Sequence, residues 1–326
     1  MRAFTAVLKN DLWRSMEHKS RFFLFTFLTA GAIIAAIFMN TGANMAGNIA
    51  VVSKNDLDFS STHYLNSTQL ETAPPMSDLV MGKYDAIVIF DESGGHTIQT
   101  IRNDEFKQTI DAIISDPSGY HSEIIDTRGI GTNIIGFMTM FILMQGNSIM
   151  FLFAEDKEKK QIRRIAASPV SFTGYLCGHS FFVFAFLLAP SMIMLSLVKI
   201  MLNIDIGFGL LDYLFLVSLI CALATAFSLF LNALVKTSDS ASMIGSASIV
   251  LTSILAGSFY PFEKGNKILE TAVRILPQKA YITLSDLMEN GKNISAWFPY
   301  GLYVIILIVL FFSIAVIKTR KNYVKS

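Results

Sequence analysis

The stretch FTGYLCGHSFFVFAFLLAPSMIMLSLV, residues Phe172–Val198, decides the fold because its 27 residues include no Asp, Glu, Lys or Arg. At 1.5 Å per residue in a helix, it is long enough to cross about 30 Å of membrane hydrocarbon. Five further apolar blocks of comparable length are Phe22–Phe38, Ile130–Phe153, Tyr213–Val235, Met243–Phe262 and Phe298–Ile317. The six blocks predict an α-helical polytopic membrane protein with six transmembrane helices.

The composition of the whole chain agrees with this prediction. Of its 326 residues, 52% are hydrophobic and 16% are charged, and the mean hydropathy is +0.51. Soluble domains carry about a quarter charged residues, so a soluble protein is a poor alternative. The two cysteines, Cys177 and Cys221, lie in predicted spans and imply no disulfide framework, which is compatible with a bacterial cell membrane.

The distribution of charge predicts the orientation. Residues 1–21 contain five basic and two acidic residues, 154–171 contain five and three, and the tail 318–326 contains four and none. Residues 40–127 contain four basic and thirteen acidic residues. Because Lys and Arg concentrate on the cytoplasmic side, we expect both termini in the cytoplasm and segment 39–129 outside, in a multi-pass protein of the plasma membrane.

The segment outside the membrane has the pattern of a small mixed α/β domain. Short β-rich runs occur at Asn48–Lys54, Asp85–Asp91 and Thr97–Asn103, the last two joined as a hairpin. Helical segments are predicted before Gly82 and at Phe106–Ser115. The chain thus combines six transmembrane helices with a small extracellular mixed α/β domain.

Three other segments outside the spans have helical character. Residues 1–21 place apolar side chains at helical spacing and predict an amphipathic N-terminal helix at the inner membrane interface. Residues 154–171 are highly charged and then gain apolar residues, which fits either a helix or a solvated loop. Residues 263–297, broken at Gly265, predict an amphipathic or re-entrant extracellular helix that ends at Pro277.

The sequence contains no recognisable catalytic chemistry. It has no Gly-x-x-x-x-Gly-Lys-Ser/Thr loop, so the chain does not bind ATP by that route. It has no His-Glu-x-x-His, paired-cysteine or Gly-x-Ser-x-Gly motif, and of its histidines only His179 falls within a predicted span. We therefore predict no catalytic residue, metal site, cofactor or nucleic-acid partner for this chain.

The predicted spans contain almost no ionisable residue but several uncharged polar ones. Gln145 and Asn147 in the second span, with Thr252 and Ser253 in the fifth, could line a path for an amphiphilic solute. Interhelical hydrogen bonding is the alternative, and it is the better explanation for each residue taken singly. The shortage of charge argues against an ion pump.

Three segments carry a family pattern. The first is AEDKEKKQIRRIAASPVSFTGYLCGH, the second GSFYPFEKGNKILETAVRILPQKAY, and the third comprises AVVSKND and GKYDAIVIFDE. In order and topology they resemble the ABC type-2 permeases, the membrane subunits of ATP-driven exporters, nearly from end to end. The first segment departs from the family at Lys160-Gln161, where Gly-Thr is usual.

The resemblance implies partners and functional positions. It implies a separate cytoplasmic ABC ATPase subunit that binds ATP and Mg, a second permease chain, identical or different, and contact with membrane lipid. In a coupling helix over Glu155–Ala166 and the turn after it, the residues implied for ATPase coupling are Glu155, Glu158, Arg163, Arg164, Ser168 and Pro169. The residues implied for an outer gate are Tyr260, Pro261, Leu276 and Pro277.

Three functions remain open at this point. The first is a permease that exports a hydrophobic or amphiphilic solute, such as a peptide antibiotic, drug or lipid, with a role in multidrug or antimicrobial peptide resistance. The alternative is a membrane sensor or resistance protein whose acidic extracellular domain captures a cationic peptide. An intramembrane enzyme ranks last, because no nucleophile and base pair is visible.

Overall fold

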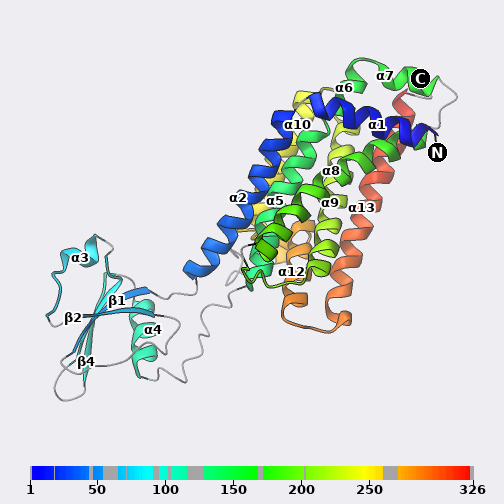
Figure 1. Cartoon of the computed structure of the whole chain (residues 1–326). Coiled ribbons are helices and arrows are strands. Elements are labelled where there is room, and N and C mark those ends of the chain that lie inside the picture. The colour runs from blue at the N-terminus through cyan, green and yellow to red at the C-terminus, as the bar shows by residue number, and fades with distance from the viewer. Residues whose placement is uncertain are drawn as a thin grey trace. The chain divides into compact units, whose positions relative to one another are not determined.

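The chain folds into two compact units, one from residues 1–37 and 128–326 and the other from residues 38–127 (Figure 1). The computed structural model describes residues 2–17, 19–43, 47–53, 65–70, 72–81, 83–90, 95–101, 104–115, 128–167, 172–201, 203–259 and 271–323. The first unit is a helix bundle, and the second is built around a β-sheet.

The bundle contains long apolar helices that follow the predicted spans. Its helices are α1 (Arg2–Glu17), α2 (Lys19–Ala43, which continues into the second unit), α5 (Ile130–Ile149), α6 (Phe151–Glu158), α7 (Gln161–Ala166), α8 (Phe172–Met201), α9 (Leu210–Leu234), α10 (Ser238–Leu255), α12 (Pro277–Glu289) and α13 (Ile294–Tyr323). The end of the bundle with α1, α6, α7 and both termini is here named the α7 end, and the opposite end, beside α12, the α12 end (Figure 1).

Four helical segments among the described residues are long and apolar enough to cross a membrane. They are Ile130–Glu158, Phe172–Met201, Leu210–Leu234 and Ile294–Asn322, and they match four of the six predicted spans, with Val235 one residue beyond the third helix. The first predicted span coincides with the shorter apolar stretch Phe23–Phe38 of α2. The fifth, 243–262, begins within α10 and runs past the last described residue before the gap, 259. The four helices are consistent with the predicted polytopic membrane protein.

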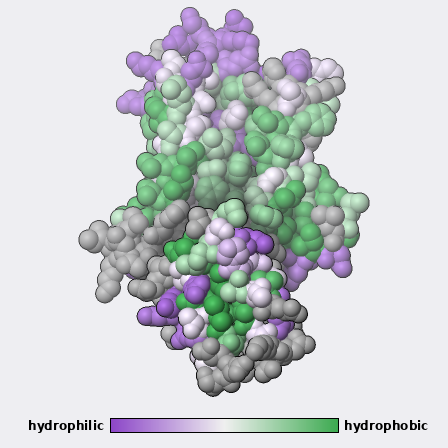
Figure 2. Space-filling model, turned by 90° about the vertical axis from the view of Figure 1, so that its left-hand side faces the viewer, coloured by the Kyte–Doolittle hydropathy of each residue, from purple (hydrophilic) through white to green (hydrophobic). Residues whose placement is uncertain are grey.

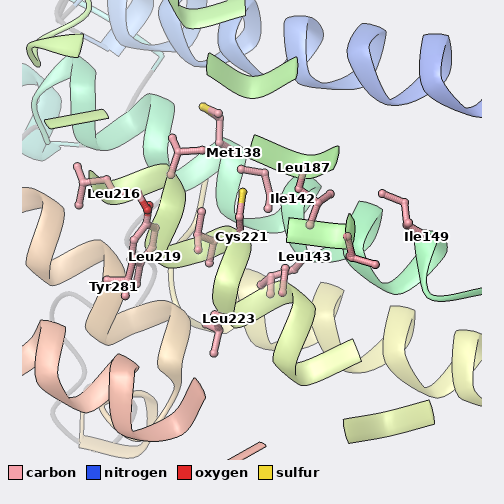
Figure 3. Packing of buried hydrophobic residues seen from close by; sticks show 14 of the residues in the cluster. Met138, Ile142, Leu143, Ile149, Leu187, Leu216, Leu219, Cys221, Leu223 and Tyr281 are labelled. Carbon is pink, nitrogen blue, oxygen red and sulfur yellow. The ribbon is translucent and has the colours of Figure 1, made fainter. Parts of the chain in front are cut away.

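Helix α9 lies at the centre of the bundle, packed against α5, α8 and α13. Figure 3 shows part of this core, with Leu216, Leu219, Cys221 and Leu223 of α9 near Met138, Ile142 and Leu143 of α5 and Leu187 of α8. Two buried tyrosines donate hydrogen bonds to backbone carbonyls, Tyr281 to Leu216 O at 2.8 Å and Tyr213 to Ile206 O at 2.6 Å. Their hydroxyls are therefore satisfied inside an apolar core.

Large apolar side chains also cover the exterior of the bundle. Exposed examples are Phe27 on α2, Ile193 on α8, Leu251 on α10 and Val309 on α13. Figure 2 shows hydrophobic residues over the sides of the bundle and hydrophilic residues at the α7 end. Lipid tails are as apolar as these side chains, so a membrane removes the cost that water would impose on this surface.

The segment expected to form one coupling helix, Glu155–Ala166, is divided in two. Helix α6 ends at Glu158 and α7 begins at Gln161. Between them Lys160 has φ 57° and ψ 20°, a left-handed conformation that interrupts a right-handed helix. The prediction of a single helix is therefore wrong. The alternative of a solvated loop is also wrong, because α7 buries Ile162 completely.

Pro277 begins a helix, whereas the sequence pattern predicted that it would end one. It is the first residue of α12, where its missing N–H costs nothing and its fixed φ favours the helix. Tyr281 and Leu284 of α12 are fully buried in the bundle core. Four residues predicted for coupling or gating lie outside the described residues: Ser168, Pro169, Tyr260 and Pro261.

Glu289, at the end of α12, holds the first turn of α5. Its Oε1 accepts a hydrogen bond from Gly131 N at 2.7 Å, and its Oε2 accepts one from Thr132 N at 2.8 Å. A helix N-terminus favours a carboxylate because its first N–H groups have no partner within the helix. Gly207 has φ 82°, and a Cβ there would lie 2.4 Å from Glu289 Oε1, so the site also requires glycine.

The second unit contains a four-stranded sheet in the order β2-β1-β3-β4. The strands are β1 (Gly47–Val52), β2 (Leu65–Leu70), β3 (Ala86–Phe90) and β4 (His96–Gln99), and the helices are α3 (Ser77–Val80) and α4 (Asp104–Ser115). β1 pairs in parallel with β2 and β3, and β3 and β4 form the predicted antiparallel pair. Ile110 and Ile113 of α4 cover one face, and Leu79 of α3 covers the other. The mixed α/β unit was predicted, but the polar edge strand β2 was not.

The Glu289 contact leads to a prediction about stability. Glu289→Gln retains the shape of the side chain but turns one acceptor into a donor that faces a backbone N–H. We expect a loss of about 1–2 kcal/mol and a lower apparent Tm, measured by intrinsic fluorescence of the purified chain in detergent. Glu17→Gln, at an exposed position on α1, serves as the control. Equal Tm values for the two variants would contradict the capping role.

Candidate functional site

A buried pair of polar side chains joins α1 to α8 at the α7 end. Asp11 of α1 is 1% exposed and His179 of α8 is 0% exposed, and 2.7 Å separates Asp11 Oδ2 from His179 Nδ1. Gly178 permits this approach, because a Cβ there would lie 3.0 Å from Phe4 O. With Asp11 ionised, Nδ1 carries the proton and donates to the carboxylate.

Arg14, one turn after Asp11, connects α1 to α6. Its Nη1 lies 2.8 Å from Asp156 Oδ1, its Nη2 lies 2.5 Å from Glu155 Oε2, and its Nη1 lies 3.7 Å from Asp11 Oδ1. Arg14 Nη2 also donates to Leu152 O at 3.3 Å. A planar guanidinium suits this role because it can serve several acceptors in fixed directions.

Tyr175 completes what we name the α1 ion cluster: Asp11, Arg14, Asp156, Tyr175 and His179. The Tyr175 hydroxyl donates to Asp156 Oδ2 at 2.7 Å, and its ring stacks on the His179 ring with centroids 6.4 Å apart. Burial lowers the pKa of Arg14, but the Glu155 hydrogen bond and the Asp156 and Glu155 charges raise it more, so its pKa is raised overall. Arg14 therefore stays charged, and the cluster holds α1, α6 and α8 together.

The last residues of α6 also clamp the connection between α9 and α10. Lys157 Nζ donates to Asn232 O at 2.8 Å and to Val235 O, at the end of α9. Glu158 Oε1 accepts a hydrogen bond from Ser238 N at 2.9 Å, at the start of α10. Each charge complements the dipole of the helix end that it contacts. Helix α6 is thus bonded to four other elements of the bundle.

The predicted coupling residues divide into two groups. Glu155 and Glu158 are occupied by partners in the bundle, as described above. Arg163 and Arg164 on α7 are exposed, beside the buried Ile162 that anchors the helix. Helix α7 therefore presents two guanidinium groups at the surface of the α7 end.

Two residues predicted for a solute path also connect helices. Gln145 Nε2 donates to Thr29 Oγ1 at 3.1 Å and so joins α5 to α2. Asn147 Nδ2 donates to Ser242 O at 3.0 Å and so joins α5 to α10. Gly245 allows this contact, because a Cβ there would lie 2.4 Å from Asn147 Oδ1.

The other two predicted path residues lie farther along α10. Gln278 Nε2 of α12 donates to Thr252 Oγ1 at 2.7 Å, so Thr252 joins α10 to α12. Ser253 is completely buried. Each of the three hydrogen-bonded residues thus joins two helices, and the solute path along the four residues stays a prediction.

Asn147 additionally lines a polar cavity between α2, α5, α6, α9 and α10. The cavity has a volume of about 310 Å³ and is lined by Leu24, Phe25, Asn147, Ser148, Phe151, Asn232, Ser238, Asp239 and Ser242. Six of these nine residues are polar, although most of the bundle surface is apolar. Among the described residues, no group of three or more His, Cys, Asp or Glu side chains is placed to hold a metal ion.

Comparison with known families gives the transport context for this site. A model described as ABC-2 family transporter protein matches residues 51–317 of the chain. The chain belongs to the ABC-2 transporter family. No match was found among curated proteins. The resemblance drawn from the loops is thus confirmed, and family membership supports a permease role for this ABC-2 chain.

The most connected residues of this ABC-2 chain were not predicted as a site. Asp11 and Arg14 lie three residues apart on α1, and Tyr175 and His179 lie four apart on α8. Both spacings place side chains on one helix face, which was the available signal. The sequence could not show that these two faces meet.

The α1 ion cluster leads to a prediction of strong non-additivity. His179→Leu leaves the Asp11 carboxylate buried without its closest partner, and we expect a loss of about 3–5 kcal/mol. The double variant Asp11→Leu with His179→Leu removes both polar groups and should recover most of that loss. Arg14 retains Asp156 and Glu155 in both variants. The measurement is the apparent Tm of each purified protein, and additive losses in the double variant would contradict the pairing.

Proposed function

We propose that this ABC-2 family chain is the permease subunit of an ATP-driven exporter for a hydrophobic or amphiphilic solute. A separate ABC ATPase subunit binds ATP and Mg, and a second permease chain, identical or different, completes the path. The observation that carries the proposal is the family match together with a short helix, α7, that exposes Arg163 and Arg164 at one end of the bundle.

The contacts of α6 support a route for ATP-derived motion. In this proposal the ATPase binds α7 in the cytoplasm, where the basic loops and both termini also lie. A displacement of α7 would move α6, and α6 in turn would move two pairs of helices. The α1 ion cluster carries it to α1 and α8, while Lys157 and Glu158 carry it to α9 and α10. Packed helices with two arrangements convert such a shift into alternating access.

The opposite end of the bundle suits an outer gate. Thr252 on α10 is tied to Gln278 on α12, directly after Leu276 and Pro277, so a shift of α10 would displace the start of α12. Glu289 anchors the other end of α12 to α5. In this proposal α12 pivots about its Glu289 end, and the solute leaves outward beside Leu276 and Pro277.

The two surface arginines give the sharpest test of the proposal. The double variant Arg163→Glu with Arg164→Glu should lose association with the ATPase subunit at least about tenfold, because two attractive charges become repulsive. Membrane insertion and apparent Tm should not change, since both side chains are exposed. Association is measured by co-purification and by ATPase stimulation in proteoliposomes.

A matched control separates the position from the charge. Lys318→Glu with Arg320→Glu makes the same charge change on the exposed surface of α13, at the same end of the bundle. We expect this control to bind the ATPase normally. Normal binding by the Arg163 and Arg164 variant, or equal loss in both double variants, would refute α7 as the docking helix.

A further inference from the structure

We propose that the polar cavity between α2, α5, α6, α9 and α10 binds the cationic headgroup of an amphiphile, so that a cationic amphiphile is the substrate class. The inference rests on the proposed permease function, and it specifies the charge of the solute. About 310 Å³ is at the lower end of the volumes of small-molecule sites, which suits a headgroup with a few methylene groups.

The cavity differs from a lipid-facing groove in the residues that line it. The chain also has an apolar groove along one face of α8, lined by Met192, Ile193, Ser196, Leu197, Ile200 and Met201, where a lipid tail would suffice. The cavity instead combines carboxamides, hydroxyls and one carboxylate with apolar side chains.

Both carboxamides of the lining use their donors within the bundle. The Nδ2–H groups of Asn147 donate to Ser242 O and Ser246 Oγ, and Asn232 Nδ2–H donates to Ser228 O at 2.9 Å. Neither carboxamide oxygen accepts a hydrogen bond from any residue that the structure describes. Asn147 Oδ1 is buried beside Gly245, so it does not itself offer an acceptor to a ligand in the cavity. A ligand that donates hydrogen bonds, such as an ammonium group, is complementary to this arrangement.

The charged side chains in and beside the cavity favour binding of a cation over binding of an anion. Lys157 is already bonded to the end of α9, and Glu158 already caps the start of α10. Asp239, the only ionisable residue of the lining, forms no ion pair with the described part of the chain. Its carboxylate is thus available to an ammonium group, while Phe25 and Phe151 offer apolar surface to the attached chain.

Protection of an introduced cysteine tests occupancy of the cavity directly. Ser148→Cys places a thiol in the lining at an exposed position. In lipid nanodiscs, the rate of N-ethylmaleimide modification at residue 148 is read by peptide mass spectrometry, which distinguishes it from Cys177 and Cys221. We expect dodecylammonium to slow the modification, whereas dodecanol and dodecyl sulfate, of equal chain length, do not.

The carboxylate is tested in the same assay. Asp239→Asn should raise the dodecylammonium concentration needed for half-protection about tenfold, because a charge-assisted hydrogen bond becomes a neutral one. Asp212→Asn, the same change in the first turn of α9, is the matched control and should leave that concentration unchanged. If Ser148→Cys fails to fold, Ser242→Cys provides a second reporter in the same lining.

Three results would overturn the proposal. The first is equal protection by the cationic, neutral and anionic amphiphiles, which would show apolar partitioning. The second is an unchanged half-protection concentration in Asp239→Asn. The third is no labelling at either cysteine, which would mean that another chain covers the cavity. The assay needs neither ATP nor the ATPase subunit, so its failure is distinct from a failure of ATPase docking at Arg163 and Arg164.

Discussion

Ionisable side chains buried between the helices of this chain depend on partners inside the protein, because lipid offers none. The pairing of Asp11 with His179 meets this constraint by joining α1 to α8. Glu289 meets it by holding the first turn of α5, and Lys157 meets it at the end of α9. Each contact joins elements that are distant in the sequence. The polar groups therefore determine how the apolar helices are assembled, although apolar contacts provide most of the packing.

Helix α6 is the place where these contacts converge. It carries the carboxylates that bind Arg14, the lysine that binds the end of α9 and the glutamate that caps α10. Lys160 then turns the chain so that α7 packs through Ile162 and exposes its arginines. A helix held at so many points transmits displacement well, since packed interfaces shift between discrete arrangements and do not deform continuously. The polar cavity lies beside the same helix, so the proposed headgroup site and the proposed docking helix α7 are close to each other in the bundle.

Features that depend on local sequence could be predicted, and features that depend on contacts between distant segments could not. Four span-length helices and the strands β1, β3 and β4 follow from block length and alternation. The break at Lys160 was missed because lysine carries no signal for a left-handed conformation. Pro277 was read as a stop because proline fits either side of a helix boundary. β2 is polar and has no alternating apolar pattern, so only its backbone pairing with β1 identifies it as a strand.

By itself, the sequence determined that the chain is a membrane protein of the ABC-2 type, because span length, hydropathy and ordered motifs are properties of contiguous residues. Tertiary structure alone decided which polar residues act together. Asn147 and Gln145, two residues apart, were expected to share a path, yet they bond to different helices, because positions two apart on a helix point in different directions. Asp11 and His179, 168 positions apart, meet only because α1 packs across Gly178. The partner of a buried polar group is chosen by packing, and packing depends on the whole bundle.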